Sequence, residues 1–173
     1  MEEVGVPVSP EDRGRRALRT YTLTAVAVVA SAVAGARAVD ADSAWYQILD
    51  KPPWQPPPWV FGAVWTPLYA SIAWAGGRAL NRTSGRSKLL LASSLGVNLA
   101  LNTTWNWLFF ARRSPKAGVV GTALLDAGNI DLIRRTARAD STAARALLPY
   151  GAWCAFATAL NSSIAWRNRS DPR

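Results

Sequence analysis

Five long apolar runs alternate with short polar or basic segments along the chain. They cover residues 18–39, 59–80, 89–110, 117–136 and 144–166. An α-helix rises about 1.5 Å per residue, so about 20 residues span a hydrocarbon core of about 30 Å. We therefore predict an all-α, multi-pass integral membrane protein, in which a bundle of five transmembrane helices forms a single domain over residues 18–168. Polar tails are expected at residues 1–17 and 169–173.

Two of these runs leave an alternative open. Basic residues precede the first run, and the small residues at 34–36 would suit cleavage of a secretory signal peptide, but the length of the run and the runs that follow favour a membrane helix. The fourth run carries Asp126, Asn129 and Asp131 and also fits a soluble amphipathic helix. In a membrane helix, Asp126 and Asn129 should share an inward face. Asp131 should reach the interface or pair with one of the arginines at 134–135.

The segment 45–65, between the first two runs, is rich in tryptophan and proline and carries only two charges, Asp50 and Lys51. Proline lacks an N–H, fixes φ and pushes the preceding residue toward an extended conformation. We therefore predict a stiff, extended aromatic loop. Tryptophan suits a boundary between an apolar and a wet environment, such as the mouth of a pocket. A proline-rich surface linker is the alternative.

Three runs place polar and aromatic side chains on one helical face, where residues three or four apart are neighbours. Unpaired amides are costly in hydrocarbon, so these faces should turn inward, either to line a binding pocket or only to bond neighbouring helices. The face residues are Trp65 and Tyr69 with Ile72 and Gly76; Asn98, Asn102, Trp105 and Asn106; and Tyr150, Trp153, Ala157 and Asn161.

Composition excludes several classes of chemistry. The formal charge of +9 comes from basic residues clustered between the apolar runs, which favours membrane flanks over nucleic-acid binding. The chain has no histidine and a single cysteine, Cys154, so neither a metal site nor a disulfide framework is predicted. No nucleophile–base pair or phosphate loop appears. We therefore predict no catalytic residues and no required cofactor.

Charge and small residues also predict orientation and assembly. Twelve basic residues fall on the side of the N-terminus and eight on the other side, which favours a cytoplasmic N-terminus. The third run carries Ala92, Ser93, Gly96 and Ala100, and small residues let helices approach closely in lipid. We predict a homodimer through this face. Packing of these residues within one copy is the alternative.

Three blocks of sequence resemble the tryptophan-rich sensory protein family, also called the translocator protein or peripheral benzodiazepine receptor family. Together with the segments between them, the blocks cover roughly residues 20–168, in the order and spacing of the family. The matching residues are Trp45, Tyr46, Leu49, Lys51, Pro52, Trp54, Pro56, Pro57, Val60, Phe61, Val64, Trp65, Leu68 and Tyr69; Leu99 to Asn102, Trp105 and Leu108 to Phe110; and the block from Leu147 to Asn161.

This resemblance implies five transmembrane helices with the first loop closing as a lid over a pocket for porphyrins such as protoporphyrin IX. Arginines at the rim would meet the propionate groups. With the inward faces, it gives the ligand-binding residues Trp65, Tyr69, Asn98, Asn102, Trp105, Asp126, Ala127, Tyr150, Trp153 and Ala157. The lid residues are Trp45, Tyr46, Lys51, Pro52, Trp54, Pro56 and Pro57. Ser162 stands where the cholesterol motif of animal members has tyrosine, which argues against a sterol partner.

The function expected from these patterns is a membrane receptor, sensor or transporter for tetrapyrroles, with lipid and a second copy as partners. An enzyme that degrades porphyrins with light is one alternative, and Trp65 and Trp153 are then the redox-active residues. A membrane scaffold that binds partner proteins is another alternative.

Overall fold

The computed structural model describes residues 9–169, and that part of the chain is all-helical, without a strand. The helices are α1 (Pro10–Ala36), α2 (Ala44–Ile48), α3 (Pro58–Asn81), α4 (Gly85–Asn106), α5 (Pro115–Ala139) and α6 (Ser141–Arg167), and a π-helical turn η1 (Trp107–Ala111) follows α4. The predicted all-α class is confirmed. Of the predicted tails, residues 1–8 and 170–173 lie outside the described residues.

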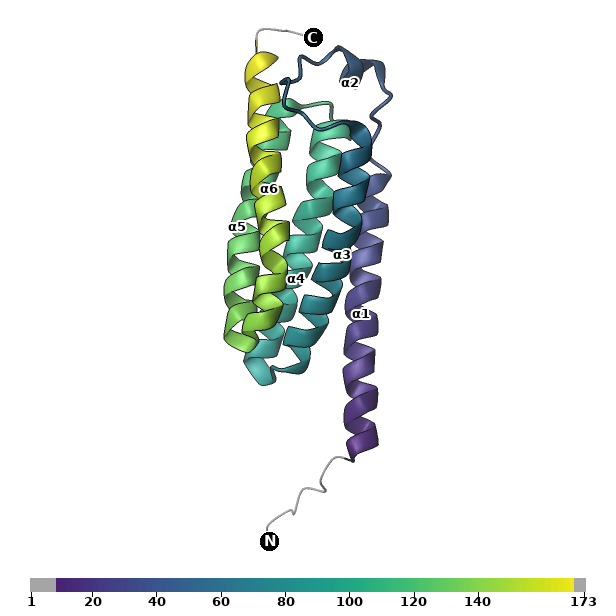
Figure 1. Cartoon of the computed structure of the whole chain (residues 1–173), viewed down its shortest axis with the longest axis vertical. Helices are drawn as coiled ribbons and strands as arrows, with labels where there is room; N and C mark the ends of the chain where they lie inside the picture. Colours follow the sequence, from purple (N-terminus) through teal and green to yellow (C-terminus); the bar gives the residue numbers. More distant parts are fainter. Residues whose placement is uncertain (1–8, 170–173) are drawn as a thin grey trace.

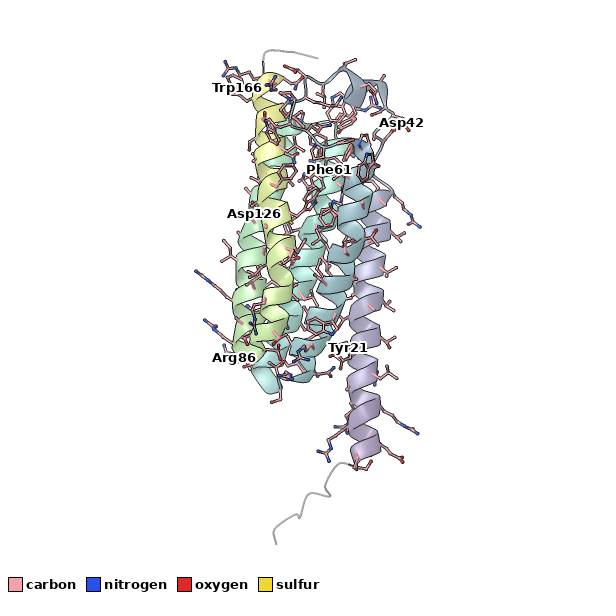
Figure 2. All side chains as sticks on the ribbon, viewed as in Figure 1. Tyr21, Asp42, Phe61, Arg86, Asp126 and Trp166 are labelled. Atoms are coloured by element: carbon pink, nitrogen blue, oxygen red, sulfur yellow. The ribbon has the colours of Figure 1, made fainter. Side chains whose placement is uncertain are left out.

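The five long helices run side by side and alternate in direction (Figure 1). The start of α1 and the α3–α4 and α5–α6 turns point to one end of the bundle, and the segment between α1 and α3 crosses the other end (Figure 1). The labelled Arg86 and Trp166 mark these two opposite ends (Figure 2). The lid segment therefore lies at the end where α6 finishes.

Helix α1 begins at Pro10, so residues 10–17 are helical where the polar sequence predicted a tail. The Ser9 side chain accepts a hydrogen bond of 3.1 Å from the Asp12 N–H, and Pro10 occupies the first helical position. Both are favourable at a helix start, and the acidic Glu11 and Asp12 suit the N-terminal end of the helix dipole. Local capping therefore extends the helix beyond the apolar run.

The Trp/Pro segment contains one short helix, α2, which includes Trp45 and Tyr46. The prediction of a wholly extended loop is wrong at these residues. Ser43 caps the helix by accepting from the Tyr46 N–H at 3.4 Å, and all the prolines come later. Pro58 takes the first turn of α3, where its missing N–H leaves no bond unmade.

The α5–α6 turn is organised around Asp140, which ends α5 and caps α6. Its Oδ1 accepts from the Ala143 N–H at 2.7 Å, and its Oδ2 lies 3.1 Å from Arg78 Nε and also pairs with Arg82 at the end of α3. The Ala143 N–H first, and then Arg78, lower the pKa of the Asp140 carboxyl. Because α6 begins at Ser141, Pro149 lies inside the helix and does not start it.

The core is formed by apolar side chains of the long helices, including the fully buried Ile72, Leu125 and Leu147. Helix α1 packs against α3 and α4. It approaches α3 closely because of Gly76 and Gly77, where an added Cβ would collide with Thr24 and Tyr21 of α1, respectively. A side chain at either glycine would push the two helices apart.

Only α1, among the described helices, is both long and apolar enough to meet a simple criterion for crossing a membrane. Its Val26, Val29 and Val33 are exposed on the outside of the bundle. Polar side chains such as Asn98 and Asn102 in α4 lower the hydropathy of the other helices, and these side chains are buried against protein. The number of membrane crossings therefore stays a prediction.

Candidate binding cavity under the lid

A cavity of about 430 Å³ lies under the lid, at the end of the bundle where α1, α3, the end of α4 with η1, and α6 meet. This volume falls in the range of about 300–1,000 Å³ that is typical of small-molecule sites. The lining residues are Ala32, Ala36, Val39, Ala41, Tyr46, Gln55, Pro58, Phe61, Gly62, Trp65, Tyr69, Trp105, Asn106, Phe109, Phe110, Leu160, Asn161 and Ile164. None of these is Asp, Glu, Lys or Arg. The cavity is therefore lined by apolar, aromatic and uncharged polar groups.

Aromatic rings form much of the wall. Trp65 stacks on Tyr69, with ring centroids 5.1 Å apart and an interplanar angle of 26°. Phe109 meets Phe110 edge to face at 4.9 Å, and Trp105 lies 6.4 Å from Phe109. Phe61 projects between α3 and α6 near the lid end (Figure 2). A wall of indole and phenyl faces suits a flat, mostly apolar ligand.

Below the cavity, a hydrogen-bonded network joins α3, α4, α5 and α6. Tyr69, which lines the cavity, donates to Asn102 at 3.2 Å, and Asn102 donates to the Tyr150 hydroxyl at 3.4 Å. Tyr150 donates to Asn98 at 2.9 Å, and Asn98 donates to Asn129 at 2.7 Å. Asn98, Asn102 and Tyr150 are buried and do not line the cavity. Their amides and hydroxyl are used between helices.

The predicted ligand residues of α5 and α6 are also not part of the cavity lining. Trp153 is half-buried and stacks on Phe156 at 5.1 Å, and it contacts Phe61 edge to face at 5.8 Å. Asp126 accepts a 2.6 Å hydrogen bond from Thr158 of α6 and is half-buried. Ala127 is exposed and Ala157 is half-buried. Of the ten predicted ligand residues, the structure brings together Trp65, Tyr69 and Trp105 on the cavity wall.

Asp131 forms the ion pair that its spacing predicted. Its Oδ2 lies 2.7 Å from Arg135 Nε, one turn away, and accepts a 2.6 Å hydrogen bond from Ser94 of α4. Asn129, by contrast, is buried. The polar residues of α5 thus contact α4 and α6.

Among residues 9–169, no group of three His, Cys, Asp or Glu side chains is placed to hold a metal ion.

Tyr46 is the predicted lid residue that lines the cavity. Burial raises the pKa of its phenol, so the hydroxyl keeps its proton. Lys51 Nζ lies 4.5 Å from the centroid of the Tyr46 ring. Trp45 contacts Phe109 edge to face at 5.6 Å, and Trp54 contacts Phe156 in the same way at 5.8 Å.

Of the predicted lid prolines, Pro52 is buried, Pro56 is half-buried and Pro57 is exposed at the start of α3. The loop is fastened to the end of α6 through Asp50. Asn168 accepts from the Asp50 N–H and donates to the Asp50 carbonyl, both at 3.0 Å. Arg167 pairs with the Asp50 carboxylate at 3.4 Å. Three contacts therefore hold the lid to the end of α6.

Several lining residues were not predicted as a site, although their spacing carries a signal. Phe61 precedes Trp65 by four positions, and Phe109 follows Trp105 by four, so each pair shares a helical face. Gln55 has no such signal, because it lies in a non-helical loop. Only the folded lid brings it over α3 and α6.

The structure thus combines a helical bundle with a lid over a neutral aromatic cavity, an arrangement that suits a small, mostly apolar ligand. The sequence model of the TspO/MBR family matches residues 22–167 of the chain. The tryptophan-rich protein TspO of Chlorobaculum tepidum is 34% identical over 72% of this chain and 79% of its own length. The human translocator protein is also 34% identical, over 72% of this chain and 74% of its own. Protein CrtK of Rhodobacter capsulatus is 32% identical over 86% of this chain and 93% of its own length. The chain belongs to the TspO/MBR family, whose members are membrane proteins.

Proposed function

We propose that this chain is a multi-pass membrane receptor, sensor or transporter that binds a tetrapyrrole, or another flat apolar molecule, in the cavity under the lid. The observation that carries the proposal is the stacked pair of Trp65 and Tyr69 in the wall of an uncharged cavity of about 430 Å³. Aromatic faces contact a planar ring system over a large area, and stacking adds to the apolar burial.

Membership of the TspO/MBR family supports the membrane location. The five long helices have 22 to 27 residues, which corresponds to about 33–40 Å at 1.5 Å per residue. That length is enough to cross the hydrocarbon core of about 30 Å. The excess of basic residues at the end shared by the start of α1 and the α3–α4 and α5–α6 turns favours a cytoplasmic location for that end.

The charge pattern of the site supports a defined ligand orientation. A tetrapyrrole with propionate groups carries negative charge on one edge, and the cavity lining offers no cation. Lys51 is not part of the lining, and its Nζ lies over the ring of Tyr46, which is. We infer that the apolar edge of the macrocycle enters the cavity and that a propionate meets Lys51 at the rim, where an ammonium–carboxylate bond is favourable.

A titration of the purified protein with protoporphyrin IX, first in the dark and then under illumination, tests the proposal. Saturable binding at a fixed stoichiometry, with the porphyrin spectrum stable in light, is the expected result. Loss of the Soret band that depends on light and oxygen would instead favour the degrading enzyme, since Trp65 already lies against the ligand space. An absence of binding would leave the scaffold as the remaining alternative.

A further inference from the structure

Gln55 is a lid residue with a buried polar atom that the fold leaves unused. Its Nε2 donates to the Tyr46 hydroxyl at 3.3 Å, and both residues line the cavity. Its Oε1 is buried and has no hydrogen-bond partner among residues 9–169. A buried acceptor without a partner costs folding free energy, and a ligand group that supplies a donor recovers that cost.

Tyr46 complements this acceptor. Its oxygen already accepts from Gln55 Nε2, so its own proton is free to donate. Both residues line the cavity, so the lid carries one unused acceptor and one free donor close together, and rotation of the Gln55 amide toward the cavity would present the covered Oε1 to a ligand. Because the lining contains no ionised side chain, this pair suits an uncharged group better than a carboxylate or an ammonium.

We propose that Gln55 and Tyr46 form a specificity pair that recognises an uncharged hydroxyl or N–H on the ligand edge inside the cavity. A hydroxyl satisfies both groups at once, since it donates to Gln55 Oε1 and accepts from the Tyr46 hydroxyl. This proposal rests on the proposed function, because it requires a flat ligand under the lid. It adds a preference among ligands of the same shape.

Two porphyrins isolate this effect. Haematoporphyrin IX carries hydroxyethyl groups where mesoporphyrin IX carries ethyl groups, and the rings and propionates are the same. The dissociation constants of both are measured by tryptophan fluorescence quenching in one detergent preparation. We expect the wild-type protein to prefer haematoporphyrin. Gln55→Met, which is similar in length and lacks the amide, should reduce that preference by about 3- to 10-fold, the scale of one net hydrogen bond.

The control is Gln47→Met, because Gln47 is the other glutamine of the chain and is exposed on α2, outside the lining. It should leave the preference unchanged. Tyr46→Phe keeps the ring and removes the donor, so it should lower the preference even if Gln55→Met folds poorly. If the protein binds both porphyrins but neither Gln55→Met nor Tyr46→Phe changes the ratio of the two dissociation constants, the role of the pair is overturned. The proposed function would stand in that case. Wild-type protein that binds neither porphyrin would overturn the proposed function and this proposal with it.

Discussion

Tyr150 of α6 donates a 2.9 Å hydrogen bond to Asn98 of α4, and both side chains are buried at the centre of the bundle. Asn102 reaches the same hydroxyl at 3.4 Å. One phenol therefore holds two amides of α4 against α6. The Tyr150 hydroxyl also supports the cavity wall indirectly, because Asn102 accepts a hydrogen bond from Tyr69, which lines the cavity.

Tyr150→Phe should destabilise the protein by about 1–3 kcal/mol, because it leaves the buried Asn98 oxygen without its donor while the ring still fills its space. Unfolding of the purified protein with a denaturing detergent measures the change. Tyr21→Phe is the matched control, since the Tyr21 hydroxyl enters no hydrogen bond within residues 9–169 and its ring packs against Gly77. Equal stability of the two variants would show that the network adds nothing to folding.

Asn168→Ala should loosen the lid, because it removes both side-chain bonds to the main chain of Asp50. Faster amide hydrogen exchange is expected in residues 44–57, with little change in the long helices. Asn81→Ala serves as the control, since Asn81 also bonds a main-chain carbonyl, that of Ala17, at the opposite end of the bundle. Unchanged exchange in the loop would mean that its aromatic contacts alone hold it.

Asp140 should make the free energy of unfolding depend on pH in the acidic range. Its pKa in the folded protein is lowered from the ordinary 3.8, so its contribution is complete above about pH 4 and is lost as the pH falls through the folded pKa. Asp140→Asn should therefore lower the melting temperature at pH 7 and have a smaller effect near pH 3. An effect of the same size at both pH values would show that the carboxylate charge contributes no stability.

Gly96 lies on the outer face of α4, and a Cβ added there would meet nothing within 4 Å. Ala92, Ser93 and Ala100 are exposed beside it. Gly96→Leu should therefore leave the monomer folded and reduce the yield of cross-linked dimer, if this face forms the proposed homodimer. Gly14→Leu, at an equally open position on α1, is the control. A dimer yield that Gly96→Leu leaves unchanged would count against this interface.

The sequence predicted the long helices well, because their apolar runs are long and the turns between them are short. It missed the extra turns at Pro10 and the helix α2, which depend on the serine caps at Ser9 and Ser43. Helical spacing identified inward faces, but it did not separate a cavity wall from a packed core. Trp65 and Asn98 both face inward, yet only Trp65 reaches the cavity, because the Asn98 amide is used by Tyr150 and Asn129. Trp153 packs on Phe61 and is not part of the cavity lining. Its role as a ligand residue therefore stays a prediction.

The measurement that tests the central claim most directly is the affinity of Trp65→Ala for protoporphyrin IX, determined with the melting temperature on the same preparation. If the ring forms the wall of the ligand site, binding should weaken by about 1–3 kcal/mol, the scale of a buried aromatic contact. Trp166→Ala, at the exposed end of α6, should bind like the wild type. A folded Trp65→Ala protein with wild-type affinity would contradict the account.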